Sequence, residues 1–133
     1  MDKHYQDAMI EHVAELEEEL AEYRQYIMQD NAAKLMAYRA IERAMQLLIE
    51  ACIGIAKQSI KAKNKQVPSD ARKAFEKMAE LGMDTLGADW KSIVGMRNAI
   101  VHDYLNLDRE KVLAVVKNNE YKVLIQFAQK ALN

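Results

Sequence analysis

The sequence predicts an all-α fold, an up-and-down bundle of four to five helices that occupies residues 1–133 as one domain. Four glycines and one proline among 133 residues are too few for the turns of a many-stranded sheet. Apolar side chains recur at intervals of three and four residues over long stretches, which is the spacing of a helix face. A hydrophobic content of 50% with 29% charged residues is typical of a folded domain and excludes extensive disorder.

The first predicted helix covers about 25 residues near the N-terminus. Its apolar face consists of Met9, Val13, Leu16, Leu20, Tyr23 and Ile27. The acidic residues Glu17 to Glu19 and Glu22 lie mostly on the opposite face, and we expect solvent around them. Asp30 and Asn31 are predicted to form a cap region between this helix and the next.

A second long helix should follow, with apolar side chains on more than one side. One stripe consists of Leu35, Tyr38, Ile41, Met45, Leu48, Cys52 and Ala56. A further set widens this stripe: Met36, Leu47, Ile49, Ile53 and Ile55. Such a broad apolar surface predicts that the second helix is central in the bundle.

The segment KAKNKQVPSD, residues 61–70, is predicted to end the second helix because Pro68 disfavours helix at the residue before it. Ser69 is expected to cap a short third helix, and Gly82 to close it. The inward residues of this third helix are Phe75, Met78 and Leu81.

The fourth helix is predicted from about Asp89 to about Tyr104. Its inward residues should be Trp90, Ile93, Val94, Ile100 and Val101. Asp108 is expected to cap the last helical region, which continues to Ala131 with an interruption at Asn118–Asn119.

Several classes of protein are excluded by local features. The longest apolar run, residues 51–56, is far too short to span a membrane. The N-terminal residues are acidic and amphipathic, unlike a signal peptide. Cys52 is the single cysteine, so the chain forms no internal disulfide, and we expect a reducing, cytoplasmic location.

Charge is distributed unevenly along the chain. Residues 1–50 carry a net charge of −6, whereas residues 51–91 carry +3. The basic residues of the second stretch have two interpretations, a solvated helix end or a rim that attracts phosphates. Under the second interpretation the RNA-binding residues are Lys57, Lys61 and Lys73.

Arg97 breaks the pattern of the fourth helix. With 100° per residue, Arg97 falls at the centre of the apolar stripe, while Asn98 and His102 lie on its border at about 100° and 140° from Arg97. A guanidinium facing a core is costly unless it is paired or used. One interpretation pairs Arg97 with Asp103, Asp84 or an acid of the first helix. The other makes it part of a functional site.

The arrangement of Arg97 and His102, with four residues between them on the penultimate helical segment, resembles the HEPN superfamily of nucleotide-binding helical domains. Asn98 directly after the arginine and Tyr104 two residues after the histidine are similar to the HepT-type toxins. The order of helices resembles that family over nearly the whole chain, so a HEPN-like bundle is expected.

The resemblance implies a metal-independent endoribonuclease without cofactor. His102 would deprotonate the ribose 2′-hydroxyl, Arg97 would neutralise charge on the phosphoryl oxygens, and Asn98 would orient the substrate or His102. A two-fold homodimer would supply a second histidine as the acid. DNA lacks the 2′-hydroxyl and should not be cut.

The HepT-type resemblance also implies a partner, a minimal nucleotidyltransferase antitoxin. This enzyme would attach AMP to Tyr104, and the added phosphate would compete with RNA for Arg97. On the fourth helix Tyr104 would lie about two turns from Arg97 on the same side. The residues alone also allow Tyr104 to be an aromatic core residue with its hydroxyl at the surface.

Other functions remain open from the residues. The chain could be a non-catalytic helical partner of a nucleotidyltransferase, with Arg97 and His102 binding nucleotide, or a purely structural dimer. A Cys52–His102 nucleophilic pair is possible in principle, although Cys52 lies within an apolar run. A carboxylate-bridged metal site lacks the Glu-x-x-His pairs that it needs.

Overall fold

The computed structural model describes residues 1–29 and 34–133, which form six α-helices and one short 3-10 helix, without strands. The elements are α1 (Lys3–Met28), α2 (Leu35–Ala62), α3 (Ala71–Glu80), α4 (Trp90–His102), η1 (Tyr104–Asn106), α5 (Arg109–Lys117) and α6 (Lys122–Leu132). The all-α prediction is confirmed. The helices outnumber the predicted four to five because the last region divides at Asn118–Asn119, where Asn119 has a φ of 58°. Asp30 and Asn31, the predicted cap region, lie outside the described residues.

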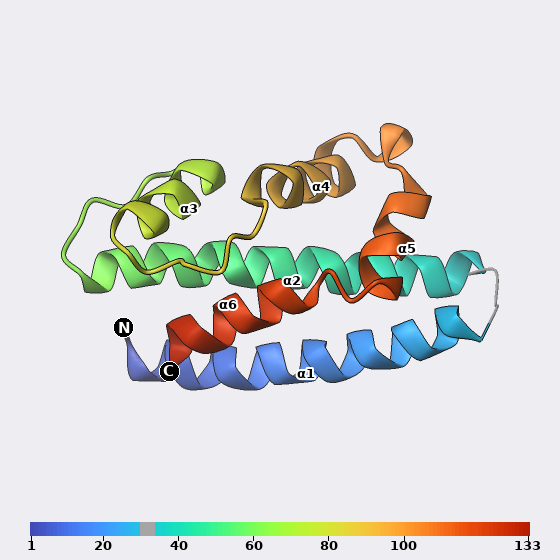
Figure 1. The fold of residues 1–133 in the computed structure, drawn as a ribbon, viewed down its shortest axis with the longest axis horizontal. Helices are drawn as coiled ribbons and strands as arrows, with labels where there is room; N and C mark the ends of the chain where they lie inside the picture. Colours follow the sequence, from blue (N-terminus) through green and yellow to red (C-terminus); the bar gives the residue numbers. More distant parts are fainter. Residues whose placement is uncertain (30–33) are drawn as a thin grey trace.

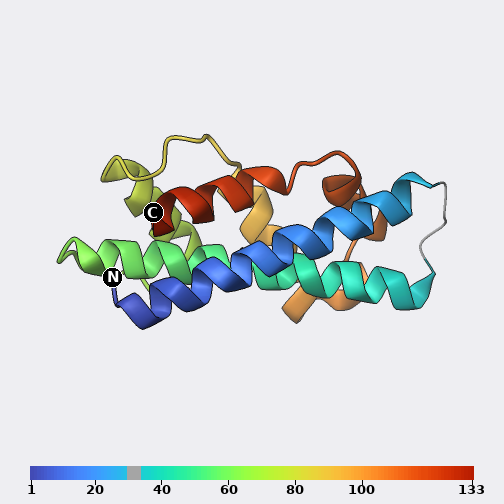
Figure 2. The ribbon, with the colours of Figure 1, turned by 90° about the horizontal axis from the view of Figure 1, so that it is seen from below.

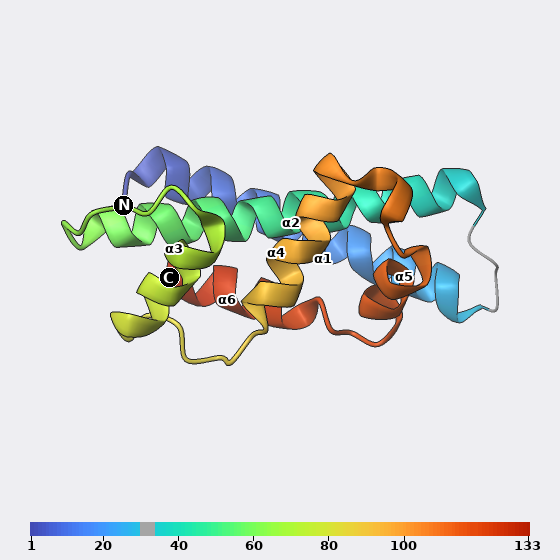
Figure 3. The same ribbon diagram turned by 90° about the horizontal axis from the view of Figure 1, so that it is seen from above.

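The helix α2 is the centre of the structure, as its broad apolar surface predicts. It runs antiparallel to α1 along the whole length of the molecule, with α6 beside both and with α3 and α4 on another side of α2 (Figure 1 and Figure 3). It contacts each of the other five α-helices. The N-terminus of α1 and the C-terminus of α6 lie near the same end of the bundle (Figure 2).

Three side chains that were expected to face inward are exposed instead. Leu35 and Met36 are 53% and 86% exposed because they form the first turn of α2, at the end of the bundle. Val101 is 43% exposed because α4 packs through Val94 and Ile100, and the next residue turns about 100° away from that face. Apolar side chains are therefore exposed at two places, the C-terminal end of α4 and the start of α2.

Aspartates cap four of the helices by accepting the backbone N–H of the third following residue. They are Asp2, Asp70, Asp89 and Asp108. The prediction for Asp108 is confirmed, whereas Ser69 is not the cap of α3. The cap is Asp70, because α3 begins at Ala71 and the Asp70 carboxylate meets the N–H of Lys73 at 3.0 Å. That hydrogen bond lowers the pKa of the Asp70 carboxyl below its usual value.

The start of α4 is fixed by aromatic packing. The Trp90 ring stacks on Phe75 of α3 with 3.7 Å between centroids and meets the edge of Phe127 of α6 at 4.8 Å. The indole Nε1 donates to Asp84 Oδ2 at 2.6 Å. Gly82 closes α3 in the left-handed conformation with φ 75°, as predicted. These contacts hold α4 across α2 and so direct its C-terminal half. No helix among the described residues has the length and apolar character of a membrane span.

Candidate functional site

The C-terminal half of α4 carries the three side chains that the sequence predicts to be catalytic. Arg97 is half-buried, and Asn98 and His102 are exposed. Their positions relative to the apolar stripe predict this ranking of burial, since Val94 and Ile100 form the buried face of α4 and Arg97 lies nearest to it. The three residues therefore stand at the boundary between the core and the solvent.

Arg97 has no ion pair or hydrogen bond with residues 1–29 and 34–133, and its Nε atom is buried without a partner. Asp84 accepts the Trp90 indole N–H instead, and Asp103 accepts the side-chain N–H of Asn106 at 2.8 Å. The interpretation in which Arg97 pairs with Asp84, Asp103 or an acid of α1 is therefore wrong. A buried, unsatisfied guanidinium nitrogen is costly and is expected where an anionic ligand completes it.

His102 is the last residue of α4, and the chain leaves the helix at Asp103. Its imidazole is exposed and makes no hydrogen bond or ion pair with the part of the chain that the structure describes. Both ring nitrogens are thus available to a substrate, as a general base or acid requires. Asn98, one helical turn before His102, is also exposed, and its side-chain amide makes no hydrogen bond with residues 1–29 or 34–133.

Tyr104 does not lie on α4, and the sequence-based placement two turns along the same helix is wrong. The helix ends at His102, and Tyr104 opens the 3-10 helix η1. Arg39 of α2 holds the tyrosine there: its Nη1 donates a hydrogen bond to the Tyr104 hydroxyl, and its guanidinium lies 5.2 Å from the ring centroid. The ring is half-buried, so it is not an enclosed core residue either.

A second arginine–tyrosine contact lies beside the first. Arg109 of α5 stands 4.9 Å from the ring centroid of Tyr38, and neither the Tyr38 hydroxyl nor Glu42 Oε2 has a hydrogen-bond partner among the described residues. Burial, and then the nearby Glu42 carboxylate, raises the pKa of Tyr38, while Arg109 acts in the opposite direction. The charge of Tyr104 also raises the pKa of Tyr38, and Arg39, which contacts Tyr104, is the next residue after Tyr38. We call Tyr38, Arg39, Glu42, Tyr104 and Arg109 the tyrosine–arginine cluster.

The three lysines predicted to bind RNA lie at the other end of α2. Lys57 and Lys61 are in its last turns, and Lys73 is on α3. Eighteen residues of helix separate Lys57 from Arg39, a distance of about 27 Å. Lys57 is half-buried and donates to the Ser69 carbonyl oxygen at 2.9 Å, whereas Lys61 and Lys73 are exposed. The structure does not bring these lysines to the Arg97 site, and their binding of RNA stays a prediction.

One mainly apolar cavity is separate from this site. It has a volume of about 500 Å³ and opens beside the first turns of α4, between α2, α5 and α6. Its walls are mainly apolar, and none of Arg97, Asn98, His102 and Tyr104 lines it. Among the described residues there is also no group of three or more His, Cys, Asp or Glu side chains placed to hold a metal ion. The candidate site therefore does not use this cavity, and its polar groups lie at the surface beside α4.

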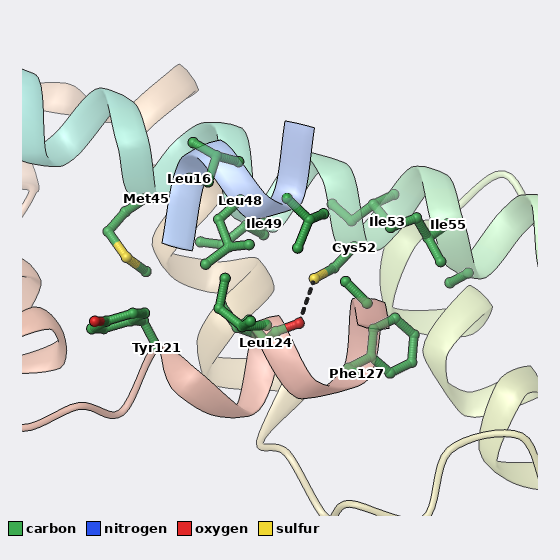
Figure 4. Close-up of a cluster of buried hydrophobic side chains, with 14 of the residues drawn as sticks. Leu16, Met45, Leu48, Ile49, Cys52, Ile53, Ile55, Tyr121, Leu124 and Phe127 are labelled. Atoms are coloured by element: carbon green, nitrogen blue, oxygen red, sulfur yellow. Dashed lines mark hydrogen bonds between the residues drawn. The ribbon is translucent and has the colours of Figure 1, made fainter. Parts of the chain in front are cut away.

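Cys52 lies in the core and does not form a pair with the exposed His102. Its exposure is 0%, and its Sγ meets the Leu124 carbonyl oxygen at 3.5 Å among Leu48, Ile49 and other apolar side chains (Figure 4). Burial raises the pKa of the thiol far above its usual value, with a smaller contribution from Asp84. The thiolate form that a nucleophile requires is therefore disfavoured.

We accordingly expect Cys52 to be inert in the native protein. Ellman's reagent should release no product from the folded chain within minutes and one equivalent after denaturation in guanidinium chloride. Pretreatment of the native protein with iodoacetamide should leave its activity unchanged. Rapid labelling of the folded chain would contradict the core position of this thiol.

Sequence reasoning missed Arg39, Glu42 and Arg109. Glu42 had a usable indication, because it falls about 40° from Tyr38 on the apolar stripe of α2 and breaks that stripe as Arg97 breaks the stripe of α4. Arg39 and Arg109 are exposed arginines on helix surfaces, which are common everywhere. Arg39 meets Tyr104, and Arg109 meets Tyr38, only because η1 and α5 pack against α2.

Comparisons with known proteins agree with this fold. The family model described as Ribonuclease HepT-like matches residues 9–131. The chain is similar to the mRNA nuclease HepT of Shewanella oneidensis, with 34% identity over 77 residues, which are 56% of this chain and 58% of that protein. The matched part thus spans little more than half of the length of that relative.

Two solved structures have the same fold. One is described as the crystal structure of a toxin–antitoxin with AMP-PNP, with a TM-score of 0.77 and 24% identity over 98% of this chain and 99% of that one. The other is a tri-AMPylated HEPN toxin of Shewanella oneidensis in complex with an MNT antitoxin, with the same TM-score and identity over 98% of this chain and 97% of that one. At this identity the likeness establishes the fold.

Proposed function

The chain belongs to the HepT-like ribonuclease family, and from this premise we propose that it is a metal-independent endoribonuclease, the toxin of a toxin–antitoxin pair. The observation that carries the proposal is the state of two side chains on α4. Arg97 has a buried Nε without a partner, and the His102 side chain is exposed and makes no hydrogen bond or ion pair with the described residues. A cation that lacks an anion and a histidine that lacks a partner are the groups that phosphodiester cleavage needs.

The proposed reaction is transphosphorylation. His102 removes the proton of the ribose 2′-hydroxyl, the 2′-oxygen attacks the adjacent phosphorus, and the 5′-oxygen leaves as it takes up a proton. Arg97 donates to the phosphoryl oxygens as their charge increases, and Asn98 orients the substrate or His102. The products are a 2′,3′-cyclic phosphate and a 5′-hydroxyl.

We propose that the active unit is a homodimer. Five residues turn a helix by about 140°, so Arg97 and His102 leave one α4 in different directions. Two α4 helices facing each other across a two-fold axis would join both groups and supply a second histidine as the acid. Exposed apolar side chains support such an interface. Val101 and Leu105, within three residues of His102 in the chain, are 43% and 97% exposed, and Met36 at the start of α2 is 86% exposed.

The proposed antitoxin is a nucleotidyltransferase that transfers AMP to Tyr104. Two observations support this proposal. One of the similar structures is a tri-AMPylated toxin in complex with an MNT antitoxin, and Tyr104 of this chain lies half-buried on η1. A phosphodiester added here would place negative charge two residues from His102 and compete with RNA for the arginines.

The proposed activity predicts that the wild-type protein cuts RNA in excess EDTA. The substrates are an end-labelled RNA and a matched oligonucleotide with a single 2′-deoxy residue at the cut position, and the protein is first confirmed by intact mass to be unmodified. We expect cleavage of the RNA with cyclic phosphate ends and no cleavage of the deoxy-substituted position. Failure of folded, unmodified protein to cut several classes of RNA would overturn the proposal in favour of a non-catalytic, nucleotide-binding partner.

A further inference from the structure

The contact between Arg39 and Tyr104 joins two residues that are 65 positions apart in the sequence. Arg39 is exposed and Tyr104 is half-buried, so the contact lies at the surface. Two features fix its geometry, the hydrogen bond from Nη1 to the phenol oxygen and the guanidinium at 5.2 Å from the ring centroid. Together they hold the phenol hydroxyl next to the guanidinium of Arg39.

The guanidinium of Arg39 has donors to spare beside that hydroxyl. An arginine carries five N–H groups, and Arg39 forms no ion pair with a carboxylate among the described residues. The ion pairs between residues that the structure describes are Lys3–Asp7 and Lys77–Glu80. Arg109, the other arginine of the tyrosine–arginine cluster, is likewise without an anionic partner there. Planar guanidinium groups with free donors suit a phosphate ligand.

We infer that Arg39 is the positioning residue for nucleotidyl transfer onto Tyr104 and that it binds the phosphodiester formed there. This inference rests on the proposed function. Arg39 is hydrogen-bonded to the Tyr104 Oη atom itself, which is the atom that becomes the ester oxygen, and the other N–H groups of the same guanidinium are donors that the new phosphodiester could accept from.

The step balances with a nucleoside triphosphate as co-reactant. The Tyr104 Oη attacks the α-phosphorus, an O–P bond forms, and the bond from the α-phosphorus to the oxygen bridging to the β-phosphorus breaks. Pyrophosphate leaves with the electron pair, and the phenolic proton passes to a base of the transferase or to solvent. Arg39 holds the hydroxyl for attack and then donates to the phosphodiester.

The test is the rate of AMP incorporation by the cognate nucleotidyltransferase with ATP, followed by intact mass. The variants are Arg39→Ala, Arg39→Lys and Tyr104→Phe. The matched control is Arg43→Ala, because Arg43 is an exposed arginine one turn further along α2 without a contact to Tyr104. Circular dichroism and the melting temperature verify that each variant is folded.

We expect Arg39→Ala to lower kcat/KM for modification by about 10–100-fold, mainly through kcat, since a charge-assisted hydrogen bond at the reacting atom is lost. Arg39→Lys should recover part of the rate, Arg43→Ala should match the wild type, and Tyr104→Phe should take up no AMP. The ³¹P resonance of the modified tyrosine should also differ between the wild type and Arg39→Ala.

The outcomes distinguish a failure of this inference from a failure of the proposed modification of Tyr104. If wild-type Tyr104 takes up no AMP, the proposed modification fails and the role of Arg39 falls with it. If the wild type is modified and Arg39→Ala is modified equally fast, the inference alone is wrong. A variant that keeps normal modification but has a raised KM for RNA would assign Arg39 to RNA binding instead.

Discussion

Replacement of His102 by alanine is expected to lower the rate of RNA cleavage by about 10²–10⁴-fold, the usual contribution of a general base or acid. The fold should not change, because His102 is exposed at the end of α4 and makes no hydrogen bond with the described residues. The measurement is single-turnover cleavage of end-labelled RNA in EDTA, with the melting temperature of the variant measured in the same buffer.

His4 offers a matched control for this prediction. It is also an exposed histidine on a helix surface, but it lies in the first turn of α1, far along the chain from α4. His4→Ala should cleave RNA at the wild-type rate. Equal losses in His4→Ala and His102→Ala, or residual cleavage by His102→Ala near the wild-type rate, would remove His102 from the mechanism.

The helices could be predicted from the sequence because their cause is local. The face formed by Met9, Val13 and Leu16 continues along α1, and α2 is central as its broad apolar surface indicates. Asp108 caps α5 as predicted, while the cap of α3 is Asp70 and not its neighbour Ser69. Serine and aspartate both cap helices, so the sequence predicts the region in which α3 begins, and the tertiary packing determines which of the two residues is the cap.

The candidate site could be predicted only in part. The position of Arg97 follows from the helix period, and its lack of a partner is the expected mark of a functional residue. Tyr104 was misplaced because nothing local shows that α4 ends at His102. Its contact with Arg39 depends on how η1 packs against α2, which is a tertiary property that no periodicity contains.

Arg97 separates the three functions that the sequence left open, because each assigns a different role to its guanidinium. In a purely structural protein Arg97 would stabilise the fold, and in a nucleotide-binding partner it would hold a phosphate without cleavage. In a ribonuclease it would act mainly in the transition state. The Nε atom is buried without a partner, so the structure gives Arg97 no stabilising bond to lose among the described residues.

We therefore expect Arg97→Met to change stability and activity in opposite directions. Methionine keeps an unbranched apolar stem next to Val94 and Ile100 and removes the unsatisfied nitrogen, so the free energy of unfolding should rise by about 1 kcal/mol. RNA cleavage should fall by about 10²–10³-fold, the usual effect of removing a donor that stabilises the transition state. Urea unfolding and single-turnover cleavage measure the two quantities on the same preparation.

Arg97→Lys provides the comparison that separates charge from geometry. Lysine keeps the positive charge but lacks the planar, two-pronged donor set, so it should recover only part of the lost cleavage rate. A destabilised Arg97→Met with normal cleavage would mean that the guanidinium is structural. If the wild type never cuts RNA and Arg97→Met is stabilised but loses affinity for nucleotide, the protein is a non-catalytic nucleotide-binding partner. A gain in stability together with a loss of cleavage is expected only when an arginine is kept at a cost to the fold for the sake of the reaction.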